Sequence, residues 1–156
     1  MLYQPNRWSC LPTAWSYVIG WPLWAVVKAI GHDGSEIRWP NLPEPNCRRG
    51  FHAQELIYLG DRFGFVTTTF EPIAAMMSPG GDEPVVINFG DRFEKIVKES
   101  NGVFTGEING CRHVVAWIDG KVLDPDRGQL KTLDDFQIET FYRIKSKWPY
   151  PADLIT

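Results

Sequence analysis

The sequence predicts an α+β fold with an antiparallel sheet, in one domain covering residues 1–156. Helical signals come first along the chain and most strand signals come later. The clearest strand signal is a hairpin around Asp119 and Gly120, because an Asp-Gly pair between two strand-like runs favours a two-residue turn. A chain of 156 residues, 44% of them hydrophobic, can bury one sizeable core without disulfide bonds.

Three helices are expected in the first half of the chain, over residues 12–19, 22–30 and 51–63. Each has apolar residues suited to a helix and is followed directly by a glycine: Gly20, Gly31 and Gly64. Residues 31–50 contain turn residues throughout, with three closely spaced prolines. We expect this stretch to form an irregular surface loop.

The second half of the chain is expected to supply most of the sheet. Strands are predicted over residues 65–70, 84–89, 113–118, 121–125 and 138–144, with 84–89 buried. Residues 71–77 are a candidate short helix, ended by a turn at 78–81. A helical turn is expected to start at Thr132, which lies three residues before the acidic Asp135.

Composition excludes several classes of protein. The chain has 16 Lys+Arg and 19 Asp+Glu, for a net charge of −3, so it lacks the concentrated positive field that nucleic acids and anionic membranes attract. The longest apolar stretch near the N-terminus, residues 17–30, is interrupted by Gly20, Pro22 and Lys28 and is no membrane span. The first residues do not resemble a signal peptide. We therefore expect a soluble, cytoplasmic protein with no nucleic-acid or membrane partner.

The chain has three cysteines, Cys10, Cys47 and Cys111. An odd number at wide spacing, with no Cys-x-x-Cys pair, argues against both a disulfide framework and a zinc site. At least one thiol is therefore free, and in a reducing compartment we expect all three to be free. No metal or other cofactor is expected.

Cys10 stands out because it directly precedes the first predicted helix. The start of a helix has backbone N–H groups without helical partners and carries the positive end of the helix dipole. Both favour a thiolate, which is the nucleophilic form of cysteine. The alternative is a buried cysteine that acts only as a small apolar residue.

Two other residues suit a reaction at this sulfur. Gln4 precedes Cys10 by six residues, and its amide can donate, together with the Cys10 N–H, to a developing oxyanion. His113 opens the hairpin and can act as general base and acid, because a catalytic cysteine and histidine need to meet in space and not in sequence.

The hairpin supplies two candidates for a third group. With a two-residue turn at Asp119 and Gly120, His113, Asp124 and Asp126 lie on one face of the ribbon. Asp126 is then the direct neighbour of His113 and Asp124 the diagonal one. Either carboxylate can fix the imidazole tautomer, so the choice between them stays open. A strand-ending turn at Asp124 is the non-catalytic alternative.

These residues together resemble a papain-like cysteine peptidase. Within that group they are most similar to the compact C39-like (bacteriocin-processing-type) peptidases, which are related to the domains that process double-glycine leader peptides. The similarity rests on Gln4, on Cys10 at a helix start, on the run from Arg112 to Trp117, and on Asp124 followed by proline. Further likeness covers residues 51–64, which resemble the family's helix before a strand, the strand at 84–89 and the late helical turn at 132–136. The family has a glycine where Arg112 precedes the histidine.

The resemblance implies a Cys-His-Asp triad with a glutamine oxyanion donor. Cys10 is then the nucleophile, His113 the base, Asp124 the orienting acid and Gln4 the donor, and the substrate is a peptide or protein. An acyltransferase or amidase with the same triad, and a papain-fold binding module without turnover, remain open alternatives.

Other candidate residues have ordinary explanations. Cys111 lacks helix support and is expected to be a core or rim thiol, while Cys47 lies beside two arginines without an evident base. His52 is expected to cap a helix or lie on the surface, and His32 to lie in a turn. Of the seven tryptophans, Trp15, Trp24 and Trp117 are expected in the core. The others, Trp8, Trp21, Trp39 and Trp148, lie near turns, where they can line a substrate groove or meet a protein partner.

Overall fold

The computed structural model describes residues 3–36, 41, 43, 50–77 and 84–147. Several sequence-based expectations lie outside these residues: the turn at 78–81, most of the predicted loop at 31–50, and the surroundings of Cys47, Trp39 and Trp148. Within the described part, four helices and an antiparallel sheet confirm the α+β class.

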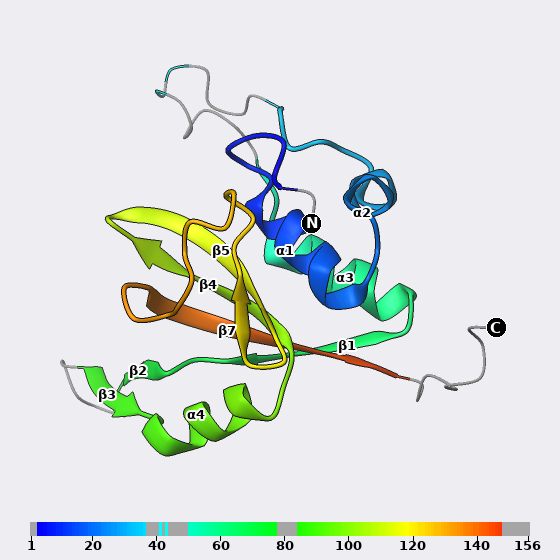
Figure 1. Ribbon diagram of the computed structural model, residues 1–156. Helices are drawn as coiled ribbons and strands as arrows, with labels where there is room; N and C mark the ends of the chain where they lie inside the picture. The colour runs from blue at the N-terminus through cyan, green and yellow to red at the C-terminus, as the bar shows by residue number, and fades with distance from the viewer. Residues whose placement is uncertain (1–2, 37–40, 42, 44–49, 78–83, 148–156) are drawn as a thin grey trace.

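Three helices form a layer on one side of the sheet (Figure 1): α1 Cys10–Ile19, α2 Leu23–Ile30 and α3 Ala53–Arg62. Helix α1 begins two residues earlier than the predicted start at residue 12, because the backbone N–H and the hydroxyl of Thr13 both donate to the Ser9 carbonyl, at 3.1 and 2.6 Å. Helices α1 and α2 both end at a glycine in the left-handed region, Gly20 at φ 72° and Gly31 at φ 92°.

Five strands build the main sheet in the order β1-β7-β4-β5-β6, with all neighbours antiparallel. Their bounds are β1 Phe65–Phe70, β4 Gly102–Ile108, β5 Cys111–Ile118, β6 Lys121–Leu123 and β7 Gln137–Ser146. Strand β1 has its predicted bounds. Strands β5 and β6 pair Ile118 with Lys121, so the predicted two-residue hairpin turn is confirmed.

The sheet separates two apolar clusters. Helices α1 to α3 bury Trp15, Val26 and Leu56 against the face that carries Val103 and Ala116. On the other face, helix α4, Gly90–Lys98, packs Phe93 and Val97 against a second cluster that includes Phe104, Val115, Leu130, Phe136 and Phe141. Because successive strand residues point to opposite faces, the pairs Val103-Phe104 and Val115-Ala116 each supply both clusters. The sheet is therefore buried on both sides, between α1 and α4 (Figure 1).

The predicted helix at residues 71–77 is wrong. Strand β2, Ile73–Met77, occupies this stretch and pairs antiparallel with β3, Pro84–Asn88. Its alanines and methionines favour a helix when taken alone, but backbone pairing with a partner strand outweighs that weak preference. The expected burial of this strand is wrong at Val86, which is 66% exposed because the ribbon stands apart from the main sheet.

One smaller correction concerns Trp24. Trp24 is 67% exposed on α2, although it was expected in the core; Trp15 is fully buried, and Trp117 donates its indole N–H to the Val97 carbonyl at 2.9 Å. The expected helical turn after Thr132 is a single turn, in which the N–H of Phe136 donates to the Leu133 carbonyl at 3.1 Å.

Helix α4 and strand β4 were not predicted from the sequence. Helix α4 does carry a readable signal, since Phe93, Ile96 and Val97 have helical spacing and pack into one cluster. Strand β4 is harder to recognise because two of its seven residues are glycines, Gly102 and Gly106, and glycine is depleted in strands.

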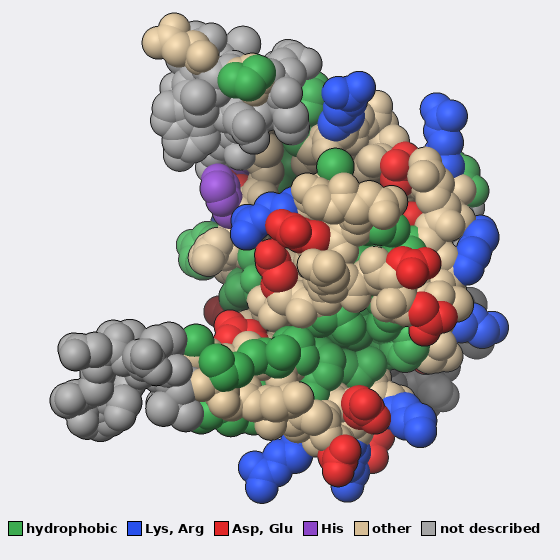
Figure 2. All heavy atoms as spheres, turned by 90° about the vertical axis from the view of Figure 1, so that its left-hand side faces the viewer, with side chains coloured by type: hydrophobic (Ala, Val, Ile, Leu, Met, Phe, Trp, Pro, Cys, Tyr) green, Lys and Arg blue, Asp and Glu red, His purple; other side chains and the backbone are tan. Residues whose placement is uncertain are grey.

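An apolar groove of about 440 Å³ lies where β1 and β2 meet α4. Phe70, Ala74, Phe89, Phe93 and Ile96 line it, and the space-filling view shows a band of hydrophobic side chains in the lower half of this face (Figure 2). The groove is formed by different elements from those that carry Cys10 and His113.

None of the helices in the described part of the chain is by itself long and apolar enough to cross a membrane. Helices α1 and α2 satisfy the length and composition test only as a pair, and the pair is bent by 115° at its break.

Candidate functional site

A short hydrogen-bonded loop fixes the position of Cys10. The side-chain oxygen of Asn6 accepts from the Trp8 backbone N–H at 3.2 Å and from the Ser9 hydroxyl at 2.5 Å. Ser9 is almost fully buried and directly precedes α1. Cys10 is thus the first residue of a ten-residue helix, where its N–H has no helical acceptor and its side chain lies in the positive end of the helix dipole.

His113 and Asp124 are joined by a short side-chain hydrogen bond. The imidazole Nε2 lies 2.7 Å from the Asp124 Oδ1. The β5–β6 ladder ends at Ala116 and Leu123, so Asp124 is the first residue beyond β6 and reaches His113 from just outside the paired strands. Because Nε2 is engaged by Asp124, Nδ1 is the ring nitrogen left for a partner on the other side.

The Asp124 carboxylate is buried, with 3% of the residue exposed, and is fully occupied by donors. Its Oδ1 also accepts the Asp126 N–H at 2.8 Å, and its Oδ2 accepts the Leu130 N–H at 2.8 Å. Burial raises the pKa of this carboxyl, but the hydrogen bonds from His113, Leu130 and Asp126 lower it more, to below its ordinary value. Asp124 is therefore a carboxylate near neutral pH.

The structure also decides between the two candidate carboxylates. Asp126 contributes its backbone N–H to Asp124, while its own carboxylate accepts from the Gln129 amide at 3.2 Å. Asp124 alone of these two bonds to the imidazole. The diagonal position in the predicted hairpin is the one used, because the ladder stops before residue 124.

Cys10 and His113 line one cleft. Burial lowers the pKa of His113, but its interactions with Asp124 and Cys10 raise it more, from 6.5 to about 9. The imidazole is therefore positively charged at neutral pH.

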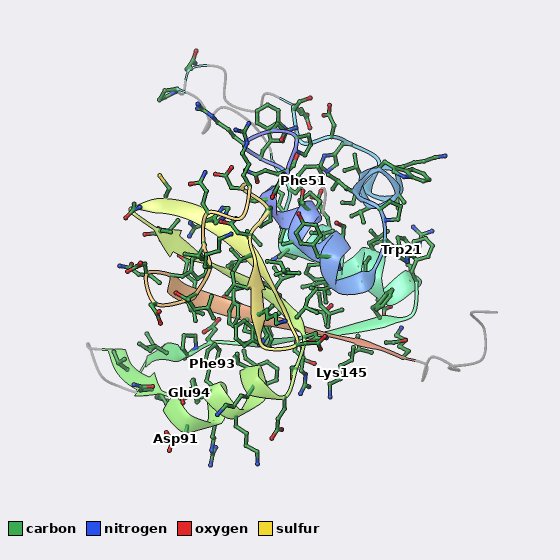
Figure 3. The ribbon with its side chains drawn as sticks, in the orientation of Figure 1. Trp21, Phe51, Asp91, Phe93, Glu94 and Lys145 are labelled. Atoms are coloured by element: carbon green, nitrogen blue, oxygen red, sulfur yellow. The ribbon has the colours of Figure 1, made fainter. Side chains whose placement is uncertain are left out.

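This cleft, which we call the large cleft, has a volume of about 490 Å³. Trp8, Phe51 and Tyr142 supply aromatic walls, and Arg112 and Glu139 supply opposite charges. Phe51 lies beside the beginning of α1 in Figure 3. The position of Trp8 agrees with the expectation that a tryptophan near a turn lines a groove. Arg112 is 82% exposed, and its guanidinium lies 3.5 Å from the Glu139 carboxylate.

Gln4 lines a second, small cleft of about 220 Å³ together with His113 and Asp124. Its backbone N–H donates to the Pro125 carbonyl at 3.0 Å, next to Asp124. Its side-chain oxygen is buried without a hydrogen-bond partner. His113 lines both clefts, so all four predicted site residues lie in one region, with Cys10 in the large cleft and Gln4 in the small one.

The remaining candidates lie outside the Cys10–His113–Asp124 group. Cys111 is an exposed free thiol that lines the small cleft. His52 caps α3, where its side chain accepts from the Glu55 N–H and Glu55 returns a bond to the His52 N–H at 3.0 Å. His32 bonds to Glu55 at 3.1 Å. Among the described residues, no group of three histidine, cysteine or acidic side chains is placed to hold a metal ion.

Several residues of the site were not identified from the sequence. The Asn6 side chain accepts a hydrogen bond from Ser9 in the loop before α1. The Leu130 N–H donates to Asp124, and Glu139 lies where the pairing of β7 with β4 is irregular. The Asn6 turn has a readable signal, since asparagine commonly bonds to the backbone two residues later. Leu130 and Glu139 have none, because their positions depend on how distant segments meet.

Comparison of the chain with models of known protein families, with curated proteins and with solved structures finds no match.

Proposed function

We propose that this protein is a cysteine peptidase with a papain-like fold. The observation that carries the proposal is the His113 imidazole, which bonds to the buried Asp124 carboxylate through Nε2 and also interacts with the Cys10 thiol. The arrangement of elements supports the same reading, since α1, with Cys10 at its start, packs against β5, which carries His113.

In the first half of the proposed reaction, the Cys10 thiolate attacks the carbonyl carbon of a peptide or isopeptide bond. The new C–S bond pushes negative charge onto the carbonyl oxygen, which the Cys10 N–H and the Gln4 amide stabilise. The His113 imidazolium gives its proton to the amide nitrogen as the C–N bond breaks. The amine product leaves and a thioester remains on Cys10.

In the second half, neutral His113 takes a proton from a water molecule whose oxygen attacks the thioester carbon. The C–S bond breaks, and Cys10 leaves as a thiolate beside the imidazolium, which restores the starting state. Asp124 keeps the ring in position and stabilises its positive charge throughout, without itself becoming protonated. No cofactor takes part in these steps.

Alkylation by iodoacetamide tests the proposed ion pair between the Cys10 thiolate and the His113 imidazolium. At about pH 6, below the ordinary thiol range near 8.5, we expect Cys10 to be alkylated much faster than Cys47 and Cys111, as followed by peptide mass spectrometry. The exposed Cys111 serves as an internal reference for accessibility. His113→Ala should remove the preference, because the neighbouring cation is lost.

His52→Ala is the matched control for this experiment. His52 is exposed and lines the same large cleft, but it caps α3 and does not pair with Asp124. We expect its removal to leave the alkylation of Cys10 unchanged. Equal alkylation rates for all three cysteines at about pH 6, in a folded wild-type protein, would contradict the proposal.

Product analysis separates the peptidase from the other reactions that a Cys-His-Asp group supports. With peptide substrates, hydrolysis predominates if the protein is a peptidase. Transfer of the acyl group to added hydroxylamine, with little hydrolysis, would assign an acyltransferase to the same residues. A protein that is alkylated selectively at Cys10 but turns over no amide would be a binding module.

A further inference from the structure

Among the residues that the structure describes, Glu139 is the one acidic residue that lines the large cleft. The other charged or titratable side chains that line the cleft beyond Cys10 and His113 are Arg112, Tyr142 and His52. Burial raises the pKa of Tyr142, a hydrogen bond with Thr140 lowers it, and the negative charges of Glu71 and then Glu139 raise it.

A β-bulge places Glu139 at this position. Thr105 pairs with Thr140 and Gly106 pairs with Ile138, so Glu139 is an extra residue in β7 with no partner in β4. A bulge leaves one residue out of the ladder and changes the direction of its side chain. Gly106 permits the bulge, because a Cβ atom there would overlap the Gln137 carbonyl group. The backbone irregularity of the sheet therefore places Glu139 in the lining of the large cleft.

Arg112 neutralises this carboxylate only weakly. Its guanidinium lies 3.5 Å from the Glu139 carboxylate, and the two side chains are 82% and 42% exposed. Ion pairs between groups this exposed contribute little, because water screens them and the side chains lose freedom when they pair. A cation that enters the cleft and sheds more water can therefore compete with Arg112 for Glu139.

The aromatic walls suit the same kind of occupant. Trp8, Phe51 and Tyr142 line the cleft together with Glu139. Lysine and arginine side chains combine an apolar stem with a charged end, so they can lie along aromatic surface while the charge meets a carboxylate. A volume of about 490 Å³ is ample for such a side chain.

We propose that the large cleft binds a lysine or arginine side chain of the peptide substrate, and that Glu139 is the residue that selects it. The inference rests on the proposed peptidase function, because it assigns the cleft beside Cys10 to the substrate. With this assignment, the protein is a peptidase that prefers substrates with a lysine or arginine near the scissile bond.

A set of short neutral peptides, in which a single lysine is moved one position at a time past the scissile bond, tests the proposal. Each peptide is paired with one that carries norleucine instead of lysine, and kcat/KM is measured for both. At one position we expect lysine to exceed norleucine by about tenfold. Glu139→Gln should abolish that preference, and Glu139→Lys should transfer it to a peptide with glutamate at the same position.

Two variants provide the controls. Glu94→Gln removes the same charge from the exposed side of α4, at the opposite end of the molecule from Phe51 in Figure 3, and should leave the lysine preference unchanged. Arg112→Gln should increase the preference by roughly threefold, because Glu139 then loses its competing partner. Higher salt should reduce the preference in the wild-type protein.

The outcomes separate this inference from the proposed function. Equal use of lysine and norleucine peptides at every position, or a lysine preference that survives in Glu139→Gln, overturns the inference while hydrolysis supports the peptidase. If no peptide is hydrolysed, binding of the same pairs to the Cys10→Ser variant is measured by calorimetry. A lysine preference that depends on Glu139 then supports the cleft assignment although peptidase function fails, and its absence overturns the assignment.

Discussion

Asp124 is the residue on which the geometry of the site depends most. Its two carboxylate oxygens accept bonds from His113, Asp126 and Leu130, each at 2.7 or 2.8 Å. Because the group is 3% exposed, water cannot replace any of these donors without opening the structure. The carboxylate therefore joins the end of β6, the turn that follows it and the imidazole into one hydrogen-bonded unit.

Replacement of Asp124 by asparagine tests its electrostatic role with little change in shape. Without the negative charge, we expect the pKa of His113 to fall from about 9 towards its ordinary value of 6.5, and kcat/KM to fall by about a hundredfold or more. NMR titration of the His113 ring measures the first effect and peptide hydrolysis the second. Asp126→Asn is the control, and it should leave both nearly unchanged. An unaltered His113 titration in Asp124→Asn would show that another group holds the proton.

At the scale of single elements, β4 depends on close backbone packing. The strand lies between β7 and β5 at the centre of the sheet. A Cβ atom at Gly102 would overlap the Tyr142 carbonyl and lie 2.7 Å from the Phe141 ring, and Gly106 has the same constraint at the bulge. These glycines are required because a neighbouring strand comes too close for a side chain, which a pattern of strand-forming residues does not reveal.

Gly102→Ala and Gly110→Ala form a matched pair that separates this packing from turn conformation. Gly110 lies in the turn after β4 at φ 73°, with open space around the position of a Cβ atom. We expect the free energy of unfolding to fall by about 3 kcal/mol or more for Gly102→Ala and by about 1 kcal/mol for Gly110→Ala. Urea denaturation followed by tryptophan fluorescence measures both. Similar losses at the two positions would argue against close packing at Gly102.

At the scale of the whole molecule, the site lies where the helical layer meets the sheet. Cys10 comes from α1 and His113 from β5, while Asp124 follows β6. The interactions of His113 with Asp124 and Cys10 are therefore available only in the folded chain. They couple the protonation of one imidazole to folding.

This coupling predicts how stability depends on pH. The pKa of His113 is about 9 in the folded protein, compared with 6.5 for a free side chain. Its contribution to stability is therefore complete below about pH 6.5 and is lost as pH rises through about 9. Over this interval we expect the free energy of unfolding to fall by on the order of 3 kcal/mol. Denaturant titrations of the wild-type protein across this pH range measure the loss.

His113→Ala provides the reference for the pH experiment. The variant lacks the titrating group, so its free energy of unfolding should change much less over the same interval. Parallel curves for the two proteins would assign the pH dependence to other residues.

Local sequence signals were sufficient for much of the fold and for the core of the site. The β-branched and aromatic run of β1 and the Asp-Gly turn between β5 and β6 each specify their structure over a few residues. The helix start at Cys10 is also local, and the hairpin register follows from the turn. His113 and Asp124 could therefore be paired in advance, with Asp126 as the rival.

Sequence signals failed where long-range pairing determined the outcome. Residues 73–77 favour a helix by composition but form β2 because β3 pairs with them. Trp24 looked like a core residue, yet it lies on the face of α2 that nothing in the described structure covers, at 67% exposure. The β4–β7 bulge that presents Glu139 arises from a mismatch between two strands that are distant in sequence.

The sequence alone determined the α+β class, a helix that starts close to Cys10, and a histidine and aspartate on one hairpin, because each depends on neighbours within a few residues. Only the tertiary structure brought Cys10 to His113, selected Asp124 over Asp126, and built the large cleft with Glu139 in its wall. These features depend on how α1 docks on β5 and on how β7 pairs with β4. Contacts between distant segments set those arrangements, and no local pattern encodes them.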